Sequence, residues 1–477
     1  QDIGREQYEL IAAIAGRTRA DEDKINLLAV GDDDQNIYAF AGASIEFIGR
    51  FETDYKAKPA YLIDNYRSTA HIIAAANALI AAVSGRMKTA HPIRIDRLRS
   101  KAPAGGDWQQ RDRVGQGGVQ ILPAGADAFS QAMAVMAEFE RMASLDRDWN
   151  WAACAVIARE WKWLEPVRSY CEWRGIPVQL ASEDSGQFWR LRETQALLAA
   201  IAARKSPLVT AQQLELWLHE HAIAGNPHHA LLAGALADYA LESGDAELPA
   251  AHFREWLAEW GHKARQRQNG LLLVTAHGAK GLEFDHVMVL DGGWKSGRNE
   301  DPAAVTRLYY VAMTRARNTL CLSRLAGLNA PHHPLLDSLA EGPHLLRRAP
   351  VDLPPAPLEL QRRHILPSLG DIDLGYAGRK PVTDAIHSTI ARLSFGSALR
   401  LEATGKGWRL LNEQRNVVGK MARDFKPPEG MHCINASVHC IHVRDKVQSD
   451  PEKYGEPRCE RWEVVVPELI FAPGEQG

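Results

Sequence analysis

Short apolar runs alternate with longer stretches of helical periodicity through the first two thirds of the chain. This alternation of strand-like and helix-like segments predicts a parallel β-sheet with helices on both faces. The α/β pattern continues from residue 1 to about residue 325. We expect strands in the following runs: INLLAVGD, AYLIDNY, GGVQILPA, CAVIAR, IPVQL, GLLLVTAH, HVMVLDGG and TLCLSR.

Two segments interrupt this alternation. Residues 101–117 are polar and rich in glycine, which predicts an exposed loop. Residues 205–269 hold no strand pattern, but their apolar positions recur at helical spacing, as in LELWLHEH and HFREWLAEWGHKARQ. We therefore predict a helical insertion over 205–269.

The composition changes near residue 350, where PVDLPPAPLELQRRHILP is typical of a stiff, proline-rich linker. Later runs such as ERWEVVVPELIF alternate apolar and polar residues, which favours β-strands. We predict a linker over 326–379 and a small antiparallel β domain over 380–477.

The 477-residue chain has an ordinary globular composition, with 45% hydrophobic and 24% charged residues. Its net charge of -3 shows no basic excess, so any contact with nucleic acid must come from a local groove. Six scattered cysteines, no signal peptide and no membrane-length apolar run predict a cytoplasmic protein without membrane contacts. Because the chain starts with Gln1 and its first methionine is Met87, we expect a fragment of a longer polypeptide.

Three aspartates and Gln35 follow the first apolar run. An EF-hand would need a bidentate glutamate at the twelfth loop position, but counting from Asp32 that position is Ala43. A calcium site is thus disfavoured. The alternative explanation of these aspartates is a solvated turn at the end of a strand.

Two further stretches place polar residues after apolar runs. LIDNYRS carries Tyr66 and Arg67, and LLVTAHGAKGLEFD carries Thr275, His277 and Glu283. Because ligands of parallel sheets bind at the carboxyl ends of strands, we expect these residues to converge at one edge of the sheet. Taken singly, an arginine after a strand is more often solvated, and a lone histidine is more often structural.

Four stretches together resemble, in the correct order, the third to sixth helicase motifs of the UvrD, Rep and PcrA family of superfamily 1 DNA helicases: VGDDDQNIYAFAGA, NYRS, TAHGAKGLEFD and YVAMTRAR. This resemblance implies RecA-like parallel sheets of the P-loop NTPase type. It also implies ATP hydrolysis between two such domains, coupled to 3′-to-5′ stepping along single-stranded DNA. The implied domains are 1–60, the end of the first RecA-like domain; 61–204 and 270–325, the second; 205–269, the insertion; 326–379, the linker; and 380–477, the β domain.

The resemblance also implies residue roles. Gln35 would sense the γ-phosphate and the attacking water, and Arg67 and Arg315 would contact the γ-phosphate, where an arginine finger supplies roughly 10³ to 10⁵ in rate. The remaining implied nucleotide contacts are Tyr66, which would stack on adenine, Glu283, which would accept from the ribose, and Gly281. The implied DNA contacts are Tyr38, Phe40, Thr275 and His277. Arg317 is better explained as a structural ion-pair partner.

Parts of the family pattern are absent. Lysine precedes serine or threonine only at Lys88, Lys205 and Lys295, and none of these follows glycine, so the sequence has no phosphate-binding loop. The Asp-Glu pair of the second motif is also missing. We therefore expect ATP and Mg²⁺ as cofactors whose remaining ligands lie in an upstream half of the same polypeptide. The fragment alone should be inactive, with single-stranded DNA and duplex junctions as partners of the whole motor.

Two alternatives remain. A non-catalytic DNA-binding or regulatory module could keep the helicase shape without hydrolysis, and a nuclease-helicase of the RecB type would need a metal-binding cluster that the tail does not show. Histidines and cysteines of the tail invite a zinc interpretation, but VHCIHV alternates like a strand, so its neighbours face opposite sides and we predict no metal site. The tail also resembles, more weakly, those of large bacterial RecQ-type fusion helicases.

Overall fold

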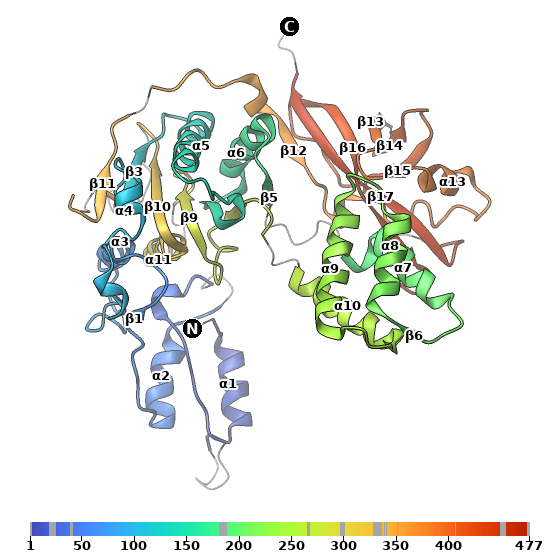
Figure 1. Cartoon of the computed structure of the whole chain (residues 1–477). Helices are drawn as coiled ribbons and strands as arrows, with labels where there is room; N and C mark the ends of the chain where they lie inside the picture. Colours follow the sequence, from blue (N-terminus) through green and yellow to red (C-terminus); the bar gives the residue numbers. More distant parts are fainter. Residues whose placement is uncertain are drawn as a thin grey trace. The chain divides into compact units, whose positions relative to one another are not determined.

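The computed structural model describes residues 2–18, 25–38, 42–180, 188–264, 268–295, 301–327, 336–337, 339, 341–350, 352–405, 407–448 and 455–474. The chain divides into two compact units, whose elements are labelled in Figure 1. The first comprises Gln1–Ala181 and Gln268–Leu360, and the second Ser182–Arg267 and Gln361–Gly477. None of the described helices is long and apolar enough to span a membrane.

A seven-stranded sheet forms the centre of the first unit, and every neighbouring pair in it is parallel. Its strands, in spatial order, are β11 (Leu345–Arg347), β3 (Val119–Pro123), β10 (Ala316–Arg324), β9 (Phe284–Val289), β4 (Cys154–Ala158), β8 (Leu271–Thr275) and β5 (Val178–Leu180). Six of the predicted strands are thereby confirmed, and so is the parallel α/β class. The sheet is consistent with a RecA-like domain.

Helices cover both faces of this sheet (Figure 1). Successive residues of one strand pack into different cores: Ile121 packs with α3 and α11, whereas Leu122 packs with α5 and α6. This alternation follows from the two-residue period of a strand and explains why the strands are apolar throughout. The helices of this unit are α1 (Arg5–Ile14), α2 (Glu46–Tyr55), α3 (Ala70–Ile80), α4 (Trp108–Arg111), α5 (Ala128–Ser144), α6 (Trp161–Arg174) and α11 (Pro302–Met313).

The first predicted strand does not form, and the second is much shorter than predicted. Residues 25–32 form no strand, and Leu28 and Val30 are 90% and 79% exposed, because no neighbouring strand pairs with them among the described residues. The second run forms only β1 (Asp64–Asn65), which pairs with β2 (Arg94–Ile95). A strand requires a partner, which a single run of sequence does not reveal.

The predicted loop at 101–117 is partly wrong. It contains the short helix α4, whose Trp108 is 3% exposed and belongs to the core beside α5 and α6. A single buried tryptophan anchors the segment although its other residues are polar.

The second unit packs helices against an antiparallel sheet. Its strands, in spatial order, are β12 (Arg363–Ile365), β17 (Arg461–Pro473), β16 (Met431–Asp445), β13 (Ala398–Thr404), β14 (Gly407–Asn412) and β15 (Val417–Lys420). The antiparallel β domain is thus confirmed. The other elements are α7 (Arg192–Ala202), α8 (Ala211–His221), α9 (Pro227–Ser243), α10 (Ala250–Ala264), α13 (Ala385–Ala391) and the pair β6 (Leu208–Val209) and β7 (Leu248–Pro249).

One apolar core joins the helical segment to this sheet, with Tyr239 and Phe253 in the same cluster as Val465 and Phe471. Arg192 reinforces the connection: its Nε lies 2.6 Å from Glu463 Oε1, and it also donates to the carbonyl of Ile390. The helical segment and the tail therefore form one structural unit, although the sequence separates them. The domain boundaries themselves stay a prediction.

Candidate functional site

Glu283 lies between two arginines. Arg67 and Arg317 each form an ion pair with its carboxylate, and Arg317 Nη1 also lies 3.7 Å from Asp285 Oδ1. The side chains of Arg67, Glu283 and Arg317 are 39%, 33% and 42% exposed, so the cluster is open to solvent and to ligands. The structural role predicted for Arg317 as an ion-pair partner is confirmed.

Arg315 lies beside this cluster and is buried, at 3% exposed. Its Nε donates to the Val311 carbonyl at 2.9 Å, Nη1 to the Leu282 carbonyl at 3.1 Å, and Nη2 to Thr314 Oγ1 at 3.1 Å. All three acceptors are neutral, and no carboxylate pairs with Arg315 within the part of the chain described.

Burial, together with the neighbouring charge of Arg67, lowers the pKa of Arg315 to about 10. The guanidinium nevertheless stays protonated near pH 7. A buried cation without a counter-ion is costly, so this position is poised to accept an anion.

Local hydrogen bonds explain why these arginines meet. Helix α11 ends at Met313 and leaves the Val311 carbonyl free to accept from Arg315. The Arg315 carbonyl in turn accepts from the Phe284 amide at 2.9 Å, which aligns the first residues of β9 and β10. Ser68 Oγ donates to the Ala316 carbonyl at 2.7 Å, which fixes Arg67 next to the same strand start.

The expected convergence at a carboxyl edge is wrong. Thr275 ends β8 and lies at the carboxyl edge, whereas Glu283 and Arg315 directly precede β9 and β10 and so lie at the amino edge. Each motif lies between two strands, and the sequence alone does not show whether a residue of the motif ends the first strand or starts the second. The connection 276–283 runs between the two edges.

Gln35 belongs to the short turn η2 (Asp33–Gln35), which packs against α11, the helix that leads to Arg315. Its Nε2 donates to Asp32 Oδ2 at 2.8 Å. Gln35 is thus in the neighbourhood of the arginine cluster.

The aspartates of this turn are held by basic residues. Asp34 accepts two hydrogen bonds from Arg86, at 2.6 and 2.7 Å, and Lys88 pairs with Asp32. Burial raises the pKa of Asp34, but the hydrogen bond from Arg86 and the charges of Lys88 and Arg86 outweigh it and lower that pKa overall. The carboxylate oxygens lie close enough together for an ion, yet cations of the protein already neutralise them.

Two of the predicted DNA contacts lie near each other. The rings of Tyr38 and His277 are 6.2 Å apart, and Lys280 Nζ lies 4.8 Å from the Tyr38 ring centroid. Arg159 Nη1 is 3.5 Å from His277 Nε2, and Thr275 Oγ1 accepts from the Gly278 amide at 3.3 Å. Phe40 lies outside the described residues.

The remaining predicted nucleotide contacts are Tyr66 and Gly281. Tyr66 is 70% exposed and directly precedes Arg67, so its ring face is available for stacking. Gly281 has a φ of +85°, a conformation that favours glycine, and it turns the chain just before Glu283.

Sequence reasoning missed Arg86, Lys88 and Arg159. Lys280 is recognisable as a polar residue of the motif TAHGAKGLEFD, but the motif alone assigned it no role. Arg86 and Lys88 gave no signal, since nothing near them marks a partner more than 50 residues away in the sequence.

Three histidines and cysteines of the tail are buried, namely Cys440, His442 and Cys459, while His432 is exposed. Cys440 and His442 are each 1% exposed, and burial raises the pKa of the Cys440 thiol. Within the described part of the tail, these side chains do not gather into a group with metal-ligand spacing.

Two family models match the chain. Residues 1–56 match the UvrD/REP helicase N-terminal domain, and residues 254–326 match the UvrD-like helicase C-terminal domain. The matched segments contain Gln35, Thr275, Glu283 and Arg315.

Named DNA helicases are similar to parts of the chain. DNA helicase II of Haemophilus influenzae is 46% identical over 87 residues, which is 18% of this chain and 11% of that protein. ATP-dependent DNA helicase UvrD2 of Mycobacterium tuberculosis is 28% identical over 347 residues, 68% of this chain and 46% of that protein. DNA helicase II of Escherichia coli is 44% identical over 88 residues, 18% of this chain and 11% of that protein.

Among solved structures, the C-terminal domain of a possible DNA helicase from Lactobacillus plantarum aligns with a TM-score of 0.24 and 16% identity, over 50% of this chain and 92% of that one. The chain spans 11% to 46% of the length of the curated relatives named above. Its two family-model matches and these relatives confirm the resemblance drawn from the motifs: the matched segments are similar to UvrD-type DNA helicases.

Proposed function

We propose that this chain is the carboxyl-terminal motor portion of an ATP-dependent helicase that steps 3′ to 5′ along single-stranded DNA. The observation that carries the proposal is Arg315, a buried guanidinium whose acceptors are all neutral, beside Arg67. Phosphoryl transfer depends mainly on positioning and on neutralising charge, and such a pair suits that task.

The residues present fit a nucleoside triphosphate. Arg67 and Arg315 would hold the γ-phosphate, Tyr66 would stack on adenine, and Glu283 would accept from the ribose. When bound, ATP supplies the phosphoryl group and a concentrated negative charge. In the structure Arg67 pairs with Glu283, so nucleotide binding requires Arg67 to exchange that carboxylate for phosphate, while Arg317 remains to hold Glu283.

Gln35 is the residue proposed to orient the attacking water. Its turn packs against α11, so a shift of Gln35 and a shift of Arg315 would be transmitted through the same helix. This arrangement offers a route from the nucleotide to the rest of the unit.

DNA contacts are proposed at Tyr38, Thr275 and His277, with Phe40 assigned from the motif alone. Stacking of bases on aromatic rings contributes roughly 1 to 3 kcal/mol per base and tolerates any sequence, which a translocase requires. Arg159 and Lys280 lie next to these rings, and Lys280 also pairs with Asp2 at 2.6 Å, so DNA phosphate would have to displace that carboxylate from Lys280. Duplex junctions are the proposed place of action.

Mg²⁺ and the triphosphate also need a glycine-rich loop and an acidic pair that this sequence lacks. We propose that a further segment of the same polypeptide supplies them and that the present chain alone hydrolyses no ATP. The absence of that loop also favours the second candidate, a helicase-like DNA-binding or regulatory module without hydrolysis.

Unwinding polarity tests the proposal. The complete polypeptide that contains this sequence would be given partial duplexes with either a 3′ or a 5′ single-stranded tail, with and without ATP. The proposal expects ATP-dependent unwinding of the 3′-tailed duplex. DNA binding without unwinding of either substrate would instead favour the regulatory module, and unwinding of the 5′-tailed duplex alone would contradict the direction.

A further inference from the structure

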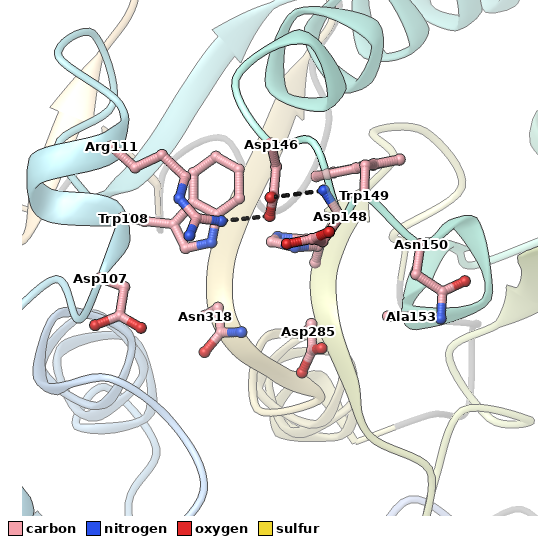
Figure 2. Close-up of a pocket in the computed structure, with 11 residues that line it drawn as sticks. Asp107, Trp108, Arg111, Asp146, Asp148, Trp149, Asn150, Ala153, Asp285 and Asn318 are labelled. Atoms are coloured by element: carbon pink, nitrogen blue, oxygen red, sulfur yellow. Dashed lines mark hydrogen bonds and ion pairs between the residues drawn. The ribbon is translucent and has the colours of Figure 1, made fainter.

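A separate cavity of about 160 Å³ lies in the first unit. Figure 2 shows its lining, which comes from α4, from the connection between α5 and β4, and from the first residues of β9 and β10. None of the residues assigned above to nucleotide or DNA lines it.

Aromatic rings form one part of the wall. His286 stacks on Trp149 with ring centroids 4.5 Å apart, and Trp108 meets His286 edge-on at 4.9 Å. Both tryptophans also line the cavity, so it offers aromatic surface as well as polar groups.

His286 is a buried polar side chain with one nitrogen still available. It is 7% exposed, and its Nδ1 lies 2.8 Å from Thr319 Oγ1. Its Nε2 has no hydrogen-bond partner among the residues that the structure describes. Burial lowers the pKa of His286 to about 4, so the ring is neutral near pH 7 and adds no positive charge to the cavity.

The lining holds four carboxylates, from Asp107, Asp146, Asp148 and Asp285, against one guanidinium, Arg111. Arg111 pairs with Asp146 and lies 5.4 Å above the Trp108 ring. The cavity therefore has excess negative charge, and its own wall already contains a guanidinium on an aromatic face.

Two of these carboxylates have no paired cation. Within the described residues no basic group pairs with Asp107 or Asp148, whereas Asp285 forms an ion pair with Arg317 at 3.7 Å. Burial raises the pKa of Asp285, as expected for a carboxylate that is poorly compensated.

The charge of the cavity and the spacing of its polar groups indicate which kind of ligand it can bind. Phosphate-bearing ligands such as DNA or ATP would be repelled by this excess of carboxylates. The carboxylates and His286 do not form a group with the spacing of metal ligands among the residues described. An organic cation satisfies both conditions, because it can span separated acceptors and place its charge over an aromatic ring.

We propose that this cavity binds a guanidinium or primary ammonium group, either on an arginine or lysine side chain of a protein partner or on a free polyamine. Asp107 and Asp148 accept hydrogen bonds from the cation, and Trp108 and Trp149 contact its body. His286 Nε2 accepts a further hydrogen bond in the tautomer in which Nδ1 carries the proton.

Isothermal titration calorimetry of the intact chain at low ionic strength, without nucleotide or DNA, tests this proposal. The probes are a blocked glycine-arginine-glycine tripeptide, its lysine and glutamate counterparts, and spermidine. The variant is Asp107→Asn combined with Asp148→Asn. Asp352→Asn is the matched control, because Asp352 is also exposed and lies outside the cavity. A thermal melt of each protein checks that it is folded.

The proposal expects binding of at least one cationic probe and at least a tenfold weaker affinity in the double variant, as expected when charge-assisted hydrogen bonds are lost. The Asp352→Asn protein should bind like the unmodified chain. Tighter binding of the arginine or lysine peptide identifies a protein side chain as the ligand, and tighter binding of spermidine identifies a free polyamine. Absence of binding, equal binding of the glutamate peptide, or unchanged affinity in the folded double variant would overturn the proposal.

Discussion

Arg67 and Glu283 form an ion pair, although the whole of the predicted helical insertion separates them in the sequence. The contact brings the fourth and fifth motif-like stretches together at the amino edge of one sheet. Arg315, from the sixth, lies beside them with only neutral acceptors. Arg67 is therefore paired with a carboxylate, whereas Arg315 is not within the described part of the chain, and the role of each can be tested.

Replacing Glu283 by glutamine should weaken nucleotide binding while changing the stability of the fold only slightly. The Glu283 side chain is 33% exposed, so loss of its ion pairs should lower the free energy of unfolding by less than about 1 kcal/mol in urea denaturation. In the complete polypeptide, we expect the KM for ATP to rise several-fold, because the proposed ribose acceptor loses its charge.

The exposed pair of Arg17 and Glu9, 3.0 Å apart, offers a control. Glu9→Gln should cost a similar amount of stability and leave the KM unchanged. Equal KM values for the two variants would exclude a role of Glu283 in nucleotide binding.

Asp34→Asn should be strongly destabilising. Arg86 is buried, with its side chain 8% exposed, and Asp34 binds it through two hydrogen bonds. Removing one partner of a buried ion pair leaves an uncompensated charge, at a cost of about 3 kcal/mol or more. Urea denaturation measures the loss, and the double variant Asp34→Leu with Arg86→Met should regain much of it. A double variant as unstable as Asp34→Asn would show that the pair does more than neutralise charge.

Gly281→Ala tests the turn that places Glu283. A Cβ at this position would meet no heavy atom within 4 Å, so the φ of +85° is the only source of strain. We expect a loss of about 1 kcal/mol in unfolding free energy. Gly49→Ala is the control, since a Cβ there is also unobstructed and Gly49 lies within a helix, where alanine stabilises. A neutral Gly281→Ala protein would contradict the backbone conformation described here.

Stability should depend on pH through His286. Burial lowers its folded-state pKa to about 4 from an ordinary value of 6.5. Between these values the unfolded chain binds more protons than the folded one, so stability is retained above pH 6.5 and lost as the pH falls towards 4. The contribution lost between pH 7 and pH 5 is about 2 kcal/mol. Denaturation of His286→Asn should show a weaker loss over that interval, whereas His219→Asn, at an exposed position, should behave like the unmodified protein.

Six strands of the parallel core were predictable because each is a compact apolar run bounded by polar residues, whereas β11 (Leu345–Arg347) was missed. The prediction failed for residues 25–32, where the pattern is equally apolar but no strand pairs with it among the described residues. Local pattern reports which residues can form a strand, and pairing decides whether they do.

The residues of the candidate site were predicted more successfully than their arrangement in space. The motifs identified Arg67, Glu283 and Arg315, but neither the ion pairs of Glu283 nor the amino-edge position of Arg315 follows from sequence spacing. The cavity near His286 was not anticipated at all, since Asp107, Asp148 and Asp285 lie far apart in the sequence and each resembles an ordinary solvated residue. Only the packing of Trp108 and Trp149 brings them together.

The most direct test of the central proposal is the DNA-stimulated ATPase rate of the complete polypeptide with Arg315 replaced by methionine or lysine. Either side chain keeps most of the buried volume of Arg315, and Arg324→Met, at the other end of β10, is the control. If Arg315 stabilises the transferred phosphoryl group, both Arg315 variants should remain folded and lose about 10³-fold or more in rate, while Arg324→Met keeps it. Folded Arg315 variants that hydrolyse ATP at the unmodified rate would contradict the proposal.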